Sequence, residues 1–139
     1  MRYYFLELLA CPVCKHHPLL LYPVEVEEKP IDDDTLRRVR CREYCGYLRR
    51  PAGEVDMSTC RECARKYIKT GVLICEKCGR WYPILDGIPR MLDDKYRRKV
   101  DDIRFLKNYY DKLPEETKRL MKNPDPKQLL SEIGPDDPP

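Results

Sequence analysis

The chain has few of the residues from which a large apolar core or a catalytic centre is built. Its 139 residues include two Phe, one Trp, two His and six Gly. No run approaches the roughly 20 apolar residues of a membrane-spanning helix, and the apolar run from Phe5 to Ala10 is interrupted by Glu7, unlike a signal peptide. There is no Ser/His/Asp set, phosphate-binding glycine loop or glycine-rich cofactor turn. We therefore expect a cytoplasmic protein with no catalytic residues.

Cysteine, proline and charge are abundant instead. The chain has eight Cys, 13 Pro and ten Tyr, and 37 % of its residues are charged. A small domain with so little apolar bulk needs staples, and inside a cell Cys-x-x-Cys pairs indicate metal ligands before disulfides. The near absence of Gln, with only Gln128, favours a thermophile. Because some hyperthermophile cytosols tolerate disulfides, disulfide bonds between these cysteines stay open as an alternative to metal binding.

The stretch from Cys75 to Leu92 organises the chain. Cys75 and Cys78 are followed at once by Gly79, which predicts a zinc knuckle, because both thiolates must reach one ion at about 2.3 Å through a tight turn. The residues from Trp81 to Leu85 predict a strand, Asp86 and Gly87 a turn, and the residues from Ile88 to Leu92 an extended segment.

Eight cysteines in four close pairs suffice for two zinc ions. In a nested pairing, one ion is bound by Cys11, Cys14, Cys75 and Cys78, and a second by Cys41, Cys45, Cys60 and Cys63 within an insertion. In a sequential pairing, Cys60, Cys63, Cys75 and Cys78 share an ion at an ordinary zinc-ribbon spacing. We favour nesting, because apolar segments precede both Cys11 and Cys75. Eight thiolates would add eight negative charges and two Zn²⁺ ions would add four positive charges. The formal net charge of +3 would therefore become −1.

The remaining segments predict a small α+β protein: a zinc-ribbon β-sheet core, a second zinc-bound insertion and C-terminal helices. We expect a short helix at 2–10, a strand at 19–28, a loop then a strand at 29–40, a buried strand at 72–74, an amphipathic helix at 93–113 and another at 114–121. The predicted domains are 1–28 with 71–92 as the core, 29–70 as the insertion, 93–133 as a helical extension and 134–139 as a disordered tail.

Two surfaces are candidates for binding. The apolar residues Ile84, Leu85, Ile88, Met91 and Leu92 exceed what a thin ribbon can bury, so either the C-terminal helix covers them or they contact a partner. In the insertion, Arg37, Arg38, Arg40, Arg49 and Arg50 lie near Tyr44 and Tyr47. Arginines interleaved with aromatics suit RNA contact, whereas a solvated face near the thiolates is an equal alternative.

The motifs Leu8-Leu-Ala-Cys-Pro-Val-Cys14, Leu19-Leu-Leu21 and Cys75–Leu92 resemble the methyltransferase-activator zinc-ribbon family. The similarity covers about residues 3–26 and 71–93, and the run Tyr-Pro-Ile-Leu-Asp-Gly-Ile-Pro is its specific part. These proteins are adaptor subunits of S-adenosylmethionine-dependent methyltransferases that modify tRNA, rRNA and release factor. The four cysteines of the insertion and the helical extension depart from the family pattern.

The resemblance implies a non-catalytic subunit that forms a heterodimer with a methyltransferase. It implies that a ribbon strand pairs edge to edge with a strand of the enzyme, and that apolar side chains close over the junction. We expect Phe5, Ile84, Ile88, Pro89, Met91 and Leu92 to be these partner-binding residues. Two other classes stay open: a zinc-ribbon RNA-binding or ribosome-associated module, and a rubredoxin-like electron carrier with iron instead of zinc.

Overall fold

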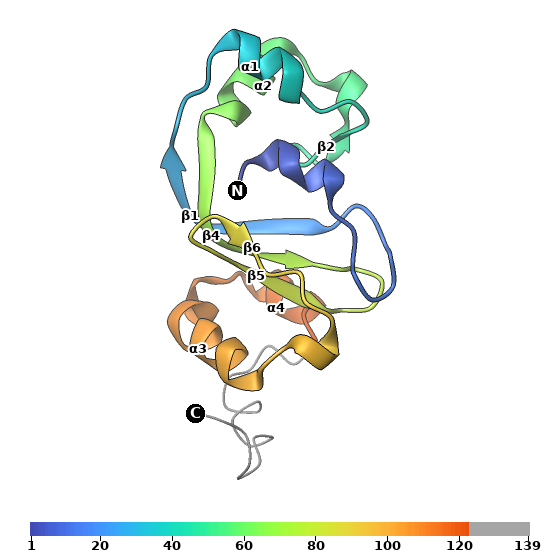
Figure 1. The fold of residues 1–139 in the computed structure, drawn as a ribbon, viewed down its shortest axis with the longest axis vertical. Helices are drawn as coiled ribbons and strands as arrows, with labels where there is room; N and C mark the ends of the chain where they lie inside the picture. Colours follow the sequence, from blue (N-terminus) through green and yellow to red (C-terminus); the bar gives the residue numbers. More distant parts are fainter. Residues whose placement is uncertain (123–139) are drawn as a thin grey trace.

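A four-stranded antiparallel sheet lies at the centre of the computed structural model, which describes residues 1–122 (Figure 1). Its strands stand in the order β1 (Leu20–Glu28), β4 (Lys66–Ile74), β5 (Trp81–Leu85) and β6 (Ile88–Pro89). The last five residues of β4 are all buried, because this strand is internal and both faces of the sheet are covered. The structure thus has the small α+β class and the β-sheet core that the sequence predicts, and it shows that the sheet is antiparallel.

The 3-10 helix η1 (Tyr3–Leu8) covers one face of the sheet. Its side chains Tyr3 and Leu6 pack in a cluster with Leu73, Tyr82 and Ile84 of the central strands. Leu73 and Tyr82 are paired across β4 and β5, so their side chains lie on the same face.

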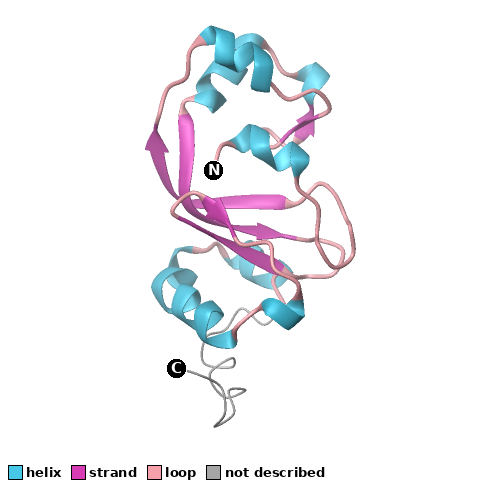
Figure 2. Ribbon diagram, in the orientation of Figure 1, coloured by secondary structure: helices cyan, strands magenta, loops and turns pink. Residues whose placement is uncertain are grey.

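The C-terminal helices cover the opposite face, below the sheet in Figure 2. After η3 (Asp94–Tyr96), they are α3 (Lys99–Tyr109), η4 (Tyr110–Lys112) and α4 (Glu115–Leu120). Leu106 and Phe105 of α3 pack against Val72, Ile74 and Trp81, and the Phe105 ring stacks on Trp81 at 5.8 Å between centroids. The predicted amphipathic helix therefore covers the sheet.

The insertion lies at the far end of the long strands β1 and β4, at the top of Figure 1. It contains α1 (Asp33–Val39), the paired strands β2 (Tyr44–Cys45) and β3 (Arg50–Pro51), η2 (Ala52–Glu54) and α2 (Met57–Ala64). The expected strand within 29–40 was wrong: a helix forms there, because the Asp32 carboxylate accepts a hydrogen bond from the Thr35 N–H at 2.6 Å and caps the first turn.

The β5–β6 hairpin confirms the predicted Asp-Gly turn. Asp86 has φ +51° and Gly87 has φ +77°, the positive pair that a two-residue type I′ turn requires. A Cβ atom at Gly87 would lie 2.9 Å from the nitrogen of Met1 and closer still to the Tyr67 ring. Glycine is therefore needed at this position both for its backbone conformation and for space.

The structure also bears on the predicted boundaries between the core, the insertion and the C-terminal extension. Strand β4 begins at Lys66, so the sheet includes 66–70, which were assigned to the insertion; the division into domains stays a prediction. The last part of the predicted helical extension, beyond residue 122, and the predicted tail at 134–139 lie outside the described residues. Within 1–122, none of the helices has the length and apolar character needed to cross a membrane.

The packing of α3 on the sheet gives a stability prediction. Leu106 is fully buried, whereas Leu8 is 74 % exposed. Leu106→Ala should lower the free energy of unfolding by about 2–5 kcal/mol, because it leaves a cavity against Val72 and Trp81. Leu8→Ala, the same chemical change at the surface, should cost about 0.5 kcal/mol or less. Denaturant unfolding of the zinc-loaded protein measures both, and equal losses would contradict this account of the core.

Candidate metal centre and docking surface

Four cysteines from two loops meet at one end of the sheet. Cys11 and Cys14 lie between η1 and β1, and Cys75 and Cys78 lie between β4 and β5. Among the residues that the structure describes, they are the one group of potential ligands whose sulfur, nitrogen or oxygen atoms all lie within 4.8 Å of one another. The Sγ atoms of Cys11 and Cys78 are 3.7 Å apart, and those of Cys14 and Cys75 are 3.4 Å apart.

These sulfur separations fit a zinc ion. Four sulfurs at about 2.3 Å from Zn²⁺ in a tetrahedron lie about 3.8 Å from one another. All four cysteines are free of disulfides, and thiolates are soft ligands that zinc prefers. A four-thiolate site has no open coordination position, so it stabilises a fold and does not activate water. Of the two pairings left open by the sequence, the structure assembles the first site of the nested one.

The two loops have the same backbone turn. The N–H of Lys15 donates to the carbonyl of Cys11, and that of Gly79 to the carbonyl of Cys75, both at 2.8 Å. Lys15 and Gly79 each follow the second cysteine and have φ of +67° and +78°. Gly79 was predicted from its residue type. Lys15 occupies the equivalent position, and no feature of its side chain indicates a positive φ.

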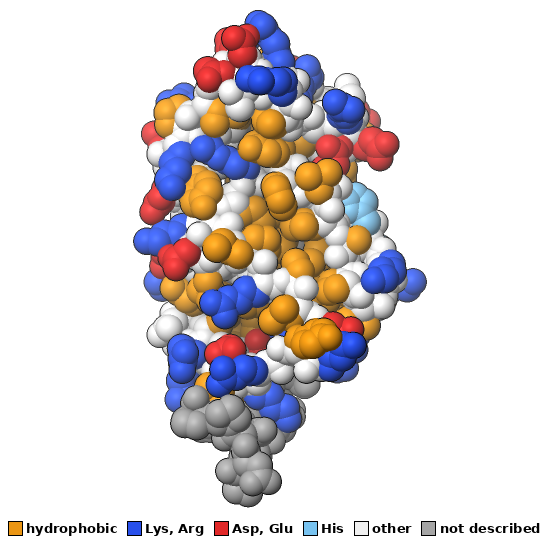
Figure 3. Space-filling view, viewed as in Figure 1, with side chains coloured by type: hydrophobic (Ala, Val, Ile, Leu, Met, Phe, Trp, Pro, Cys, Tyr) orange, Lys and Arg blue, Asp and Glu red, His pale blue; other side chains and the backbone are white. Residues whose placement is uncertain are grey.

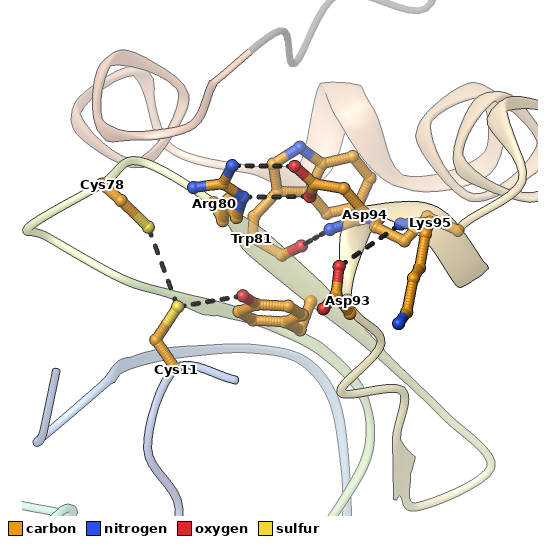
Figure 4. A network of polar contacts seen from close by, with 9 residues as sticks. Cys11, Cys78, Arg80, Trp81, Asp93, Asp94 and Lys95 are labelled. Carbon is orange, nitrogen blue, oxygen red and sulfur yellow. Dashed lines mark hydrogen bonds and ion pairs between the residues drawn. The ribbon is translucent and has the colours of Figure 1, made fainter. Parts of the chain in front are cut away.

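Polar groups surround the sulfurs on the side of β5 (Figure 4). The buried Tyr82 hydroxyl lies 3.1 Å from the Cys11 sulfur and donates to it when that sulfur is a thiolate. Burial alone would raise the pKa of Cys11, but hydrogen bonds from the backbone of Cys14 and from Tyr82 lower it to about 6. This support favours the thiolate that a metal ion requires.

An arginine balances the charge of the same cluster. Arg80 forms a two-point ion pair with Asp94, at 2.9 and 2.7 Å. Although burial acts to raise the pKa of Cys78, hydrogen bonds from the backbone and side chain of Arg80 lower it overall. A zinc ion with four thiolates carries two net negative charges, so a neighbouring guanidinium is favourable. The cluster is thus linked through Arg80 to the start of the C-terminal segment.

Removal of this cluster should unfold the sheet. The double change Cys75→Ser and Cys78→Ser should abolish zinc binding and lower the melting temperature steeply, since a structural zinc site contributes about 10 kcal/mol or more to folding. Zinc content by mass spectrometry and melting by circular dichroism measure the two effects. Val13→Ser, an exposed change in the loop that carries the other two ligands, Cys11 and Cys14, is the control. A metal-free double variant with unchanged melting would contradict a structural role.

The other four cysteines belong to different elements of the insertion. Cys45 lies in β2, Cys41 follows α1, and Cys60 and Cys63 lie on α2. The Cys60–Cys63 pair lies on a helix and not in a turn, because the Asp56 carboxylate caps the helix by accepting a hydrogen bond from the Thr59 N–H at 2.9 Å. All four line one cavity of about 30 Å³. They are not gathered as tightly as the first cluster, so a second zinc ion stays a prediction.

The predicted partner-binding residues divide between core and surface. Ile84 is fully buried under η1. Pro89 and Met91 are half-buried, while Phe5, Leu92 and Ile88 are 43 %, 42 % and 65 % exposed. Figure 3 shows hydrophobic side chains gathered along the middle of the face that carries η1 and β6. Leu8 and Tyr96 are also exposed; the sequence offered no signal for them beyond their apolar character.

Strand β6 forms one edge of the sheet. Ile88 pairs with Leu85 directly across the two-residue turn, so its N–H and C=O both face β5. The next bond to β5 is made by the Arg90 N–H, which donates to the Pro83 carbonyl at 2.9 Å. By the antiparallel alternation, the Pro89 carbonyl and the Met91 N–H point away from β5. An acceptor and a donor are thereby presented at the edge, beside the exposed Ile88 side chain.

The five arginines predicted to contact RNA are all exposed, but they do not form one assembled site. Arg37 pairs with Asp34 at 3.4 Å on α1. Arg49 lies over the Tyr22 ring and donates to the Leu21 carbonyl, so it is held against β1. RNA contact by Arg37, Arg38, Arg40, Arg49 and Arg50 stays a prediction.

Comparison with known proteins assigns the chain to a family. Residues 2–87 match the family model described as Trm112p-like protein, so the insertion lies within the match and the C-terminal helices lie beyond it. A chain in the structure of the E. cuniculi Mtq2–Trm112 complex, responsible for methylation of the eRF1 translation termination factor, is 22 % identical with a TM-score of 0.47. The alignment covers 67 % of this chain and 96 % of that one. No curated protein sequence matches.

Proposed function

Because the chain belongs to the Trm112p-like family of non-catalytic methyltransferase activators, we propose that it binds and stabilises S-adenosylmethionine-dependent methyltransferases acting on tRNA, rRNA or release factor. The observation that carries the proposal is the exposed edge of β6, where free backbone groups lie beside apolar side chains. An Mtq2-like enzyme is the first partner to test, since the E. cuniculi relative is found in such a complex.

The partner strand would add to the sheet beside β6. The Pro89 carbonyl and the Met91 N–H supply the backbone pairing, and such pairing gives affinity without depending on a particular partner sequence. Ile88 and Leu92, with Phe5 from η1, supply apolar surface that leaves water on binding. One activator can therefore serve several enzymes that share an exposed strand.

Activation in this arrangement is a consequence of binding. A subunit that binds only the folded enzyme shifts the enzyme's folding equilibrium toward the native state. It also covers apolar surface on both partners. The methyl donor and the reacting groups then belong to the partner, and the zinc cluster maintains the shape of the loops that end β4 and begin β5.

Capture of a partner tests the proposal. The chain should be tagged at its C-terminal end, because the Met1 amine is buried and donates to the Ile68 carbonyl at 2.9 Å. Purified from its native cells, it should recover a methyltransferase at one-to-one stoichiometry. Recovery of RNA alone, lost steeply with added salt, would overturn the proposal and favour the RNA-binding alternative.

A single exposed side chain should decide whether β6 is the contact. Ile88→Asp should weaken capture of the methyltransferase at least tenfold, because it buries a charge at the junction, while zinc content stays unchanged. Val26→Asp is the matched control, since Val26 is an exposed apolar residue on β1 at the opposite edge of the sheet, and it should leave capture intact. Undiminished capture by Ile88→Asp would place the contact elsewhere.

A further inference from the structure

We propose that the insertion binds a second structural zinc ion through Cys41, Cys45, Cys60 and Cys63. All four line a cavity of about 30 Å³ enclosed by α1, β2, η2 and α2. A cavity needs only about 10–15 Å³ to hold one water molecule, so there is room for an ion. The rest of the lining is largely apolar, including Leu36, Ala52 and Val55, so the cysteines are the natural ligands there.

Cys45 begins a backbone turn of the same kind as the turns that begin at Cys11 and Cys75, the first cysteines of the two knuckles. The Arg49 N–H donates to the Cys45 carbonyl at 2.7 Å, as Lys15 does to Cys11 and Gly79 to Cys75. Arg49 also has a positive φ, +58°, and Cys45 pairs with Arg50. The Leu48 N–H points at the Cys45 sulfur, 3.4 Å away.

This third turn differs from the knuckles in one respect. Leu48 stands at the position that Cys14 and Cys78 occupy in the other two turns, so the turn offers one sulfur instead of two. The remaining ligands must come from elsewhere in the insertion. The turn is otherwise shaped as a metal-binding loop, although the Cys41–Cys45 spacing of the sequence gives no indication of it.

Helix α2 supplies two of the missing sulfurs. Cys60 and Cys63 are three residues apart, so both lie on the same face of the helix, and both line the cavity. Cys41 is the fourth and begins the loop that leads to β2. Rotation about χ1 redirects the sulfur of a cysteine, so the four sulfurs can turn toward an ion in the cavity that they line.

The loop that carries Cys41 is held in place by Glu7 of η1. The Glu7 carboxylate accepts hydrogen bonds from the backbone N–H groups of Arg42 and Tyr44, at 2.9 and 3.0 Å, and from that of Glu43 between them. Three oriented N–H groups on one carboxylate fix the path between Cys41 and Cys45. Because the loop is already ordered, less conformational entropy is lost when an ion binds.

The insertion has little else to stabilise it. Between residues 29 and 65, its buried apolar residues are Leu36, Cys45, Ala52, Val55 and Ala64. Two short helices and a pair of two-residue strands around so small a core need a staple. Four thiolates on one ion provide it, and like the first cluster they leave no open position for catalysis.

Counting the metal in the purified full chain tests the proposal without any substitution. The wild-type protein should contain two zinc ions per chain, and exchange with ¹¹³Cd should give two cadmium resonances typical of four-sulfur coordination. One ion per chain together with one cadmium resonance would overturn the proposal. So would a disulfide among these four cysteines in protein purified under reducing conditions.

Variants assign the second ion to the insertion. Cys60→Ser with Cys63→Ser should lower the zinc content from two ions to one and retain the resonance of the first cluster, which shows that the sheet stays folded. Arg61→Ser, an exposed change between them on the same helix, should retain both ions. If the double variant retained both zinc ions, the assignment would be overturned. Capture of a methyltransferase is measured separately, so failure of the docking proposal is distinguishable from failure of this one.

Discussion

The convergence of Cys11, Cys14, Cys75 and Cys78 is the constraint on which the rest of the structure depends. The first pair precedes β1, and the second pair joins β4 to β5, so one cluster fixes three strands at the same end of the sheet. The two turns have equivalent backbone hydrogen bonds, and each has a residue of positive φ directly after its second cysteine. The sulfurs therefore meet at separations suited to a tetrahedral ion. The short strand β6 and its exposed edge follow from where this cluster places β5.

The sheet is covered on both faces by elements far apart in the sequence. Helix η1 seals one face around Tyr82, and α3 seals the other around Trp81. These neighbouring residues of β5 alternate between the faces, and each also has a polar role: Tyr82 through its hydroxyl toward Cys11, and Trp81 through its indole N–H, which donates to the Lys122 carbonyl at 3.1 Å. Metal cluster and core are therefore one cooperative unit, consistent with a scaffold and not an active site.

The surface around β6 and the insertion have different physical characters. Near β6, apolar side chains and free backbone groups are exposed, as in a surface that pairs with another strand. In the insertion, exposed arginines lie on the surface, and four cysteines line an internal cavity together with mostly apolar residues. The docking edge and the proposed second zinc site therefore do not compete for the same residues, and an activator can present one to an enzyme while the other maintains the shape of the insertion.

By itself, the sequence determined the ligand chemistry, the Asp-Gly hairpin and the amphipathic pattern of α3, because each depends on residue type and short spacing. It also carried the family resemblance, which the match over residues 2–87 confirms. Only the tertiary structure decided that Cys75 and Cys78 meet Cys11 and Cys14 and not Cys60 and Cys63, since spacing permits both. It also decided that Ile84 is buried while Ile88 is exposed, because that depends on which face η1 covers. The sequence also contained no indication of the turn at Cys45. Its shape is a property of the backbone, and Leu48 stands where a second cysteine would have indicated a knuckle.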